Sequence, residues 1–131
     1  MDSDQTESSR PRPRPVDLPM ARPERVMVAL STAPDRETAR TIARALVDER
    51  LAACVNLIEP MTSIYRWDGR IEESTEVGLI IKTISSRLSA LEARLRALHP
   101  YALPELIAWP ITEGSPPFID WVIGQTRRVR A

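Results

Sequence analysis

Short apolar runs alternate with amphipathic stretches along this chain, and the first two predict a strand followed by a helix. The run "VMVALST" at 26–32 is rich in β-branched and short apolar residues, which is typical of a buried strand. Apolar residues then recur every three to four positions through 35–50, the spacing of an amphipathic helix. Asp35 is suited to cap the start of that helix, because its carboxylate can accept a backbone N–H of the first turn.

A pair of strands joined by a tight turn is predicted next. The segment 51–67 has the composition of one long strand, interrupted near Pro60. Proline has no N–H to give to a ladder, so its position implies a bulge. "WDGR" supplies the Asp-Gly of a two-residue hairpin turn, and 74–84 is the returning strand.

The rest of the chain predicts a second helix, a fourth strand and a terminal helix. The second helix starts near Ser85 with leucines along one side, and Glu92 and Arg96 are spaced to pair on its exposed side. A strand over 106–112 and a short helix opening at Ser115 follow. The order, βαββαβ plus a C-terminal helix, predicts an α+β fold, a ferredoxin-like split βαβ with a long hairpin.

The long hairpin and the apolar pattern of its second strand predict assembly. Residues 54–67, fully extended, span roughly 45 Å at about 3.3 Å per residue, whereas a domain of about 100 residues is only about 35 Å across. Projecting strands leave open edges with which another chain can pair. In 77–84, apolar residues point to both faces, although helices are expected on only one. A second subunit is the simplest cover, and the terminal helix of the same chain is the alternative.

Composition and charge narrow the classes of partner. Residues 1–23 are rich in Pro and Arg without a periodic apolar pattern, so we expect a disordered tail before a domain over 24–131. The 18 basic and 18 acidic residues cancel, which disfavours nucleic-acid binding, although a basic arm in the tail is the alternative. We expect no membrane span and no secretory signal, hence a cytoplasmic protein. The single cysteine excludes an internal disulfide.

Several short segments follow one another in an order that is specific when they are taken together: "STAPD" (31–35), "LVDERLAACVN" (46–56), "SIYRWDGRIEE" (63–73), "LIIKT" (79–83), "HPYALPEL" (99–106) and, more weakly, "FIDWV" (118–122). Over residues 25–127 the chain resembles the CutA family, the divalent-cation tolerance proteins. The resemblance implies a ferredoxin-like domain in a tight homotrimer, whose long hairpin pairs across subunits.

The resemblance also carries expectations about function. It implies a response to divalent metal ions, with copper or another divalent metal as the candidate cofactor and no enzymatic activity. The family trimer is similar to that of the PII signalling proteins, which bind small effectors between subunits. A PII-like module that binds a small anionic effector is therefore the alternative function.

His99, the only histidine, and Cys54 are the candidate metal ligands. Imidazole is a common copper and zinc ligand, but a His before a proline also suits the end of a helix. Cys54 lies among small apolar residues, where a free cysteine is usually a buried hydrophobe. The resemblance implies further copper ligands at two positions that are here Ser31 and Leu98. Neither is a good copper ligand, so we expect weak binding.

Six further residues are candidates for a ligand-binding cleft between subunits: Lys82, Glu105, Tyr65, Trp67, Tyr101 and Trp109. Lys82, the only lysine, can hold an anion there or pair with Glu105. The aromatic residues can line the cleft or pack at an interface, where aromatics are enriched. No Gly-rich phosphate loop and no Ser/His/Asp signature is present, so the sequence does not predict an enzyme.

Overall fold

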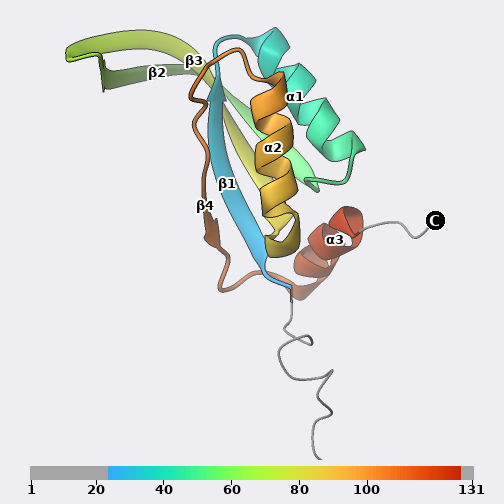
Figure 1. Ribbon diagram of the computed structural model, residues 1–131. Helices are drawn as coiled ribbons and strands as arrows, with labels where there is room; N and C mark the ends of the chain where they lie inside the picture. The colour runs from blue at the N-terminus through green and yellow to red at the C-terminus, as the bar shows by residue number, and fades with distance from the viewer. Residues whose placement is uncertain (1–23, 128–131) are drawn as a thin grey trace, which may run out of the picture.

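The computed structural model describes residues 24–127, which form a four-stranded antiparallel sheet with three α-helices (Figure 1). The elements are, in chain order, β1 (Val26–Ala33), α1 (Arg36–Asp48), β2 (Cys54–Trp67), β3 (Arg70–Ile84), a 3₁₀ turn (Ser85–Arg87), α2 (Leu88–Leu98), β4 (Ile107–Pro110) and α3 (Pro116–Thr126). The strand order is β2-β3-β1-β4, and every neighbouring pair is antiparallel. The expected disordered tail at 1–23 lies outside the described residues, as do residues 128–131.

The capping and turn signals of the sequence form where they were predicted. The carboxylate of Asp35 accepts the N–H of Thr38 at 2.7 Å, and this bond to the charged form lowers the pKa of Asp35. Ser115 caps α3 in the same way through a backbone N–H of its first turn. At the hairpin tip, Asp68 and Gly69 have φ angles of 52° and 76°, the positive values that this class of two-residue turn requires.

Three of the four strands have an end that differs from the predicted one by two residues or more. β2 begins at Cys54, because the first two N–H groups of 51–53 both bond to the carbonyl of Leu46 and close the end of α1. β3 begins at Arg70, since its ladder with β2 continues right up to the turn. β4 covers only Ile107–Pro110, because a proline at its end removes one ladder donor. The predicted elements therefore exist with shifted ends.

One face of the sheet packs against α1 and α2 and forms the main core. The side chains at its centre are buried: Ala29, Leu79 and Ile81 from the sheet, and Ile42, Leu46, Leu91 and Leu95 from the helices. Burial of each large aliphatic side chain stabilises the fold by about 1.5–3 kcal/mol. This core fixes which residues of each strand face the helices, and therefore which face the other way.

The opposite face of the sheet lacks a helical cover over most of its area. The pairing register places two rows of side chains across all four strands: Trp109, Val28, Lys82 and Cys54 in the first, and Ile107, Leu30, Ile80 and Asn56 in the second. We call these eight residues the open face. Trp109 and Ile107 are 44% and 57% exposed. α3 packs at one end of the sheet, where Val122 is buried with Val26 and Ile84, and it leaves the open face uncovered.

The β2–β3 hairpin extends beyond the helices (Figure 1). The pairing register shifts between Ile58 and Met61, a bulge at the place that Pro60 predicted. Beyond the bulge the apolar side chains of Ile64 and Ile71 are 67% and 70% exposed. The hairpin thus projects from its own core, as expected from its length.

Candidate functional site

The segment after α2 is a structural joint built on His99. α2 ends at Leu98, and His99 has extended φ and ψ angles of −86° and 137°. The following proline disfavours the helical conformation at this position. The N–H of His99 still donates to the carbonyl of Leu95 at 2.9 Å, so His99 completes the last turn of the helix. The backbone therefore places His99 at the end of a helix, which is one of the two roles that the sequence left open.

Both ring nitrogens of His99 have partners within the chain. The backbone N–H of Tyr101 donates to Nδ1 at 3.2 Å, and Nε2 lies 2.7 Å from the carbonyl oxygen of Thr32. A backbone N–H can only donate, so Nδ1 is the acceptor and Nε2 carries the proton given to Thr32. His99 is buried, with 7% of the residue exposed. Neither nitrogen therefore presents a free lone pair.

Tyr101 continues this set of contacts towards β3. Its ring packs on His99, with centroids 4.7 Å apart, and its hydroxyl donates to Oε2 of Glu76 at 2.8 Å. Burial, the hydrogen bond to Glu76 and the charge of Glu76 raise the pKa of Tyr101 to about 12. The phenol is consequently protonated across the physiological range, and the loop is tied to both β1 and β3.

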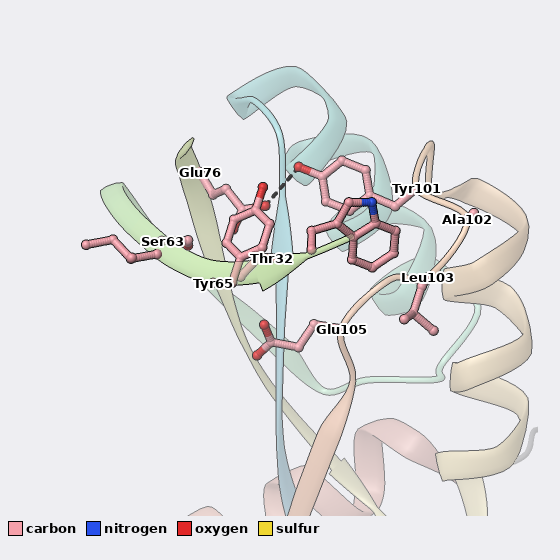
Figure 2. A pocket seen from close by; sticks show the side chains of 10 residues that line it. Thr32, Ser63, Tyr65, Glu76, Tyr101, Ala102, Leu103 and Glu105 are labelled. Carbon is pink, nitrogen blue, oxygen red and sulfur yellow. Dashed lines mark hydrogen bonds between the residues drawn. The ribbon is translucent and has the colours of Figure 1, made fainter. Parts of the chain in front are cut away.

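A cavity of about 620 Å³ lies between the hairpin and this loop, as Figure 2 shows. Its walls come from β1, the two hairpin strands and the α2–β4 loop: Thr32, Ser63, Ile64, Tyr65, Trp67, Glu76, Tyr101, Ala102, Leu103 and Glu105. The loop is held in place by the His99 joint and by the hydroxyl of Ser31, which donates to the carbonyl of Glu105 at 2.7 Å. The cavity is therefore preformed by the fold.

Four of the six predicted cleft residues meet in this cavity: Tyr65, Trp67, Tyr101 and Glu105. Lys82 and Trp109 do not. Both lie on the open face, in the same row across the strands. Sequence reasoning also missed Glu76, which is 7% exposed. Its only signal was a charged residue directly before the apolar end of β3.

The expected ion pair between Lys82 and Glu105 does not form within the chain. The ammonium of Lys82 donates to Oδ1 of Asn56, its diagonal neighbour on β2. This partner was wrongly predicted, because the register of the sheet, which sets the distance, is not visible in the sequence. The predicted pair of Glu92 and Arg96 is confirmed, at 4.0 Å.

The two candidate metal ligands are far apart within one chain. His99 bonds to Thr32, whereas Cys54 lies in the row of Val28, four residues earlier on β1. At about 3.3 Å per residue this separation is about 13 Å along the sheet. Among residues 24–127 no group of three or more His, Cys, Asp or Glu side chains is placed to hold a metal ion.

Comparison with known proteins decides the family. The family model described as CutA1 divalent ion tolerance protein matches residues 27–125. The chain belongs to this family. The CutA protein of Thermus thermophilus, a divalent-cation tolerance protein, is 52% identical over 95 residues, which are 72% of this chain and 92% of that relative. The solved Cut A1 structure from that organism has a TM-score of 0.77 at 49% identity, covering 78% of this chain and 99% of its own.

CutA relatives differ in length and in described location. Protein CutA of Mus musculus is 50% identical over 107 residues, which are 82% of this chain but only 60% of the mouse protein. A solved structure from Archaeoglobus fulgidus, 36% identical with a TM-score of 0.76, covers 78% of this chain and 99% of its own and is described as periplasmic. Within residues 24–127 no helix is long and apolar enough to cross a membrane. The cytoplasmic location stays a prediction.

Proposed function

We propose that this chain is a non-enzymatic divalent-cation tolerance protein of CutA type that responds to metal ions as a cytoplasmic homotrimer. In this proposal copper and other divalent metals bind only weakly. The observation that carries it is the state of His99, whose two ring nitrogens are engaged by Thr32 and Tyr101. A metal at His99 must displace one of these bonds, and a single imidazole cannot build a closed first shell.

The proposed trimer, with a ferredoxin-like subunit, is supported by two surfaces of the single chain. The open face exposes Ile107 and Trp109, and the hairpin exposes Ile64 and Ile71. Exposed apolar side chains on a sheet face and along a projecting hairpin are typical of interaction surfaces. Pairing of the hairpin with a neighbouring copy removes both from water.

A copper titration tests the metal part of this proposal. We expect micromolar or weaker affinity in calorimetry with a competing chelator, unchanged within error in a His99→Ala variant. A Cys54→Ser variant is the matched probe of the other candidate ligand, which three subunits could bring together. A sub-micromolar site that disappears with His99 contradicts the proposal, because it requires the ring to leave its partners.

The cavity favours a second function, PII-like binding of a small effector at a border between subunits. It lies between the hairpin and the α2–β4 loop, and the His99 joint holds that loop in place, so a ligand does not have to order it. Lys82, on which the expected anionic effector depended, lies outside its walls. The charge of the ligand therefore has to be inferred from the residues that do line it.

A further inference from the structure

The walls of the cavity combine aromatic rings with carboxylates. Tyr65, Trp67 and Tyr101 supply three rings, and Glu76 and Glu105 supply two acidic groups. No Lys, Arg or His occurs among the lining residues. The formal charge of the walls at neutral pH is thus negative, with no cation in the lining to offset it.

Glu76 keeps part of its hydrogen-bonding capacity free. Glu76 is buried, with 7% of the residue exposed, and its Oε2 accepts a hydrogen bond from the hydroxyl of Tyr101. Among residues 24–127, Oε1 has no hydrogen-bond donor, and neither Glu76 nor Glu105 forms an ion pair. A buried carboxylate with one neutral donor is under-compensated, and a cation in the adjacent space would stabilise it.

The raised pKa of Tyr101 agrees with the position of Glu76. Burial is the largest cause, and the hydrogen bond to Glu76 and the charge of Glu76 follow. The Glu76 carboxylate therefore lies close enough to act on a charge placed beside Tyr101, and it repels a negatively charged ligand there.

The rings are placed to receive a cation. Tyr65 and Trp67 lie at alternate positions of β2 and so project to the same side of the hairpin. Tyr101 approaches from the opposite wall, and Figure 2 shows its ring, the ring of Tyr65 and the side chain of Glu105 around one space. Aromatic faces attract ammonium and guanidinium groups through the ring quadrupole, by about 0.5–2 kcal/mol each.

We propose that this cavity binds a small organic cation, an ammonium or guanidinium group on a compact apolar body, between the Tyr65, Trp67 and Tyr101 rings and the Glu76 and Glu105 carboxylates. The inference rests on the second proposed function and assigns the charge of its ligand. A hard divalent ion fits less well, because it prefers six or more oxygen ligands, mainly carboxylates and carbonyls, whereas these walls offer two carboxylates, a few neutral hydroxyls and several apolar and aromatic groups.

The test compares choline with its neutral isostere, 3,3-dimethylbutan-1-ol, and with propionate, each titrated into the full-length protein by calorimetry. We expect choline to bind at least about tenfold more tightly than the alcohol, and propionate not to bind. Trp67→Leu is expected to weaken choline binding about tenfold. Glu105→Gln is expected to weaken choline binding about fivefold and to leave alcohol binding unchanged.

Matched controls separate the cavity from the rest of the surface. Trp121→Leu removes a tryptophan on α3 with an exposed fraction of 43%, close to the 50% of Trp67. Glu37→Gln removes a carboxylate on the exposed side of α1. Both variants are expected to bind choline within about twofold of the parent protein, since neither residue lines the cavity.

The outcomes distinguish this inference from the functions on which it rests. Equal affinity for choline and the alcohol overturns it, because the site is then merely apolar. Preferential binding of propionate also overturns it but leaves effector binding in place. No binding of any of the three, for example because a neighbouring subunit fills the cavity, overturns both the cation site and the effector function. The weak-metal proposal then depends on the copper titration alone.

Discussion

His99, Tyr101 and Glu76 form a continuous line of contacts that fastens the α2–β4 loop to two strands. The imidazole bridges Thr32 and Tyr101, and the Tyr101 hydroxyl reaches Glu76. Each of these groups is buried or partly buried, where an unmade hydrogen bond costs more than a made one contributes. The sole histidine of the chain therefore has a positional role that accounts for its contacts without a metal.

Replacing His99 by alanine is expected to lower the free energy of unfolding by about 2–4 kcal/mol. The N–H of Tyr101 loses its partner, and the carbonyl of Thr32 keeps only the long 3.5 Å contact with the hydroxyl of Ser31, in a site that is shielded from water. Urea denaturation followed by circular dichroism measures this. Arg96→Ala, on the exposed side of α2, is the control, with an expected effect within about 0.5 kcal/mol. If His99→Ala lowers the free energy of unfolding by no more than Arg96→Ala does, the structural role of His99 is contradicted.

The contribution of Tyr101 to stability is expected to disappear at high pH. Its pKa is raised to about 12 in the folded chain, from an ordinary value of 10. A raised pKa means that the folded state holds the proton more tightly, so the contribution is complete below pH 10 and is lost as pH rises towards 12. Urea midpoints of the parent and of Tyr101→Phe are therefore expected to differ by a constant amount below pH 10 and to converge between pH 10 and 12. Tyr65→Phe is the control. A difference between the urea midpoints of the parent and Tyr101→Phe that stays constant over this pH range contradicts the prediction.

The hairpin is the element in which the proposed assembly can be tested separately from the folding of one chain. Every residue from 64 to 73 is exposed, whereas the core residues lie in the inner parts of β1, β3 and the helices. We call residues 64–73 the outer hairpin. Ser63 and Ser74 are paired across β2 and β3, so a two-residue turn can join them in place of the outer hairpin. The outer hairpin therefore contributes little to the core of one chain.

Substitution of residues 64–73 by Asn-Gly is expected to leave the secondary structure of the core intact and to break the oligomer. An Asn-Gly turn suits the twist of the two strands it joins. Circular dichroism and light scattering after size exclusion report the two properties separately. A Gly69→Ala variant, strained at its φ of 76° but with the strands unchanged, is expected to remain oligomeric. An intact oligomer without residues 64–73 excludes the hairpin as the main contact.

At the scale of the whole molecule, the single chain leaves one face of its sheet largely uncovered and a hairpin projecting from its core. Single apolar side chains on a surface are normal, but Ile107 and Trp109 lie side by side on one edge strand. An edge strand with exposed apolar residues is a hazard unless a partner covers it. A closed assembly of copies removes that hazard.

The protein is expected to have about three times its 14.8 kDa chain mass in light scattering at micromolar concentration. Removal of residues 1–23 is expected to leave the number of subunits unchanged, because that segment is rich in proline and charge. An Ile107→Asp variant, which places a charge on the open face, is expected to shift the mass towards the monomer. A monomeric parent protein contradicts the trimer.

The sequence by itself determined the order of the elements, their caps, the hairpin turn, the bulge near Pro60 and the family. These features depend on residues close together in the chain: the side chain of Asp35 caps its own helix, and Asp68 and Gly69 form their own turn. Periodicity and turn chemistry act over a few residues, so they can be recognised without coordinates. Four of the six residues that the sequence offered for a cleft, Tyr65, Trp67, Tyr101 and Glu105, line one cavity.

Only the tertiary structure decided which side chains meet. Glu76 lines the cavity, Lys82 donates a hydrogen bond to Asn56, and Trp109 lies on the open face. The residues next to them in the sequence do not indicate these positions. Their distances depend on the strand register and on the path of the α2–β4 loop, which are set by the packing of the core. The same packing places the end of α2 next to the carbonyl of Thr32, 67 residues earlier in the chain, so that Nε2 of His99 has a hydrogen-bond partner there. Nδ1 accepts the N–H of Tyr101 in the following loop.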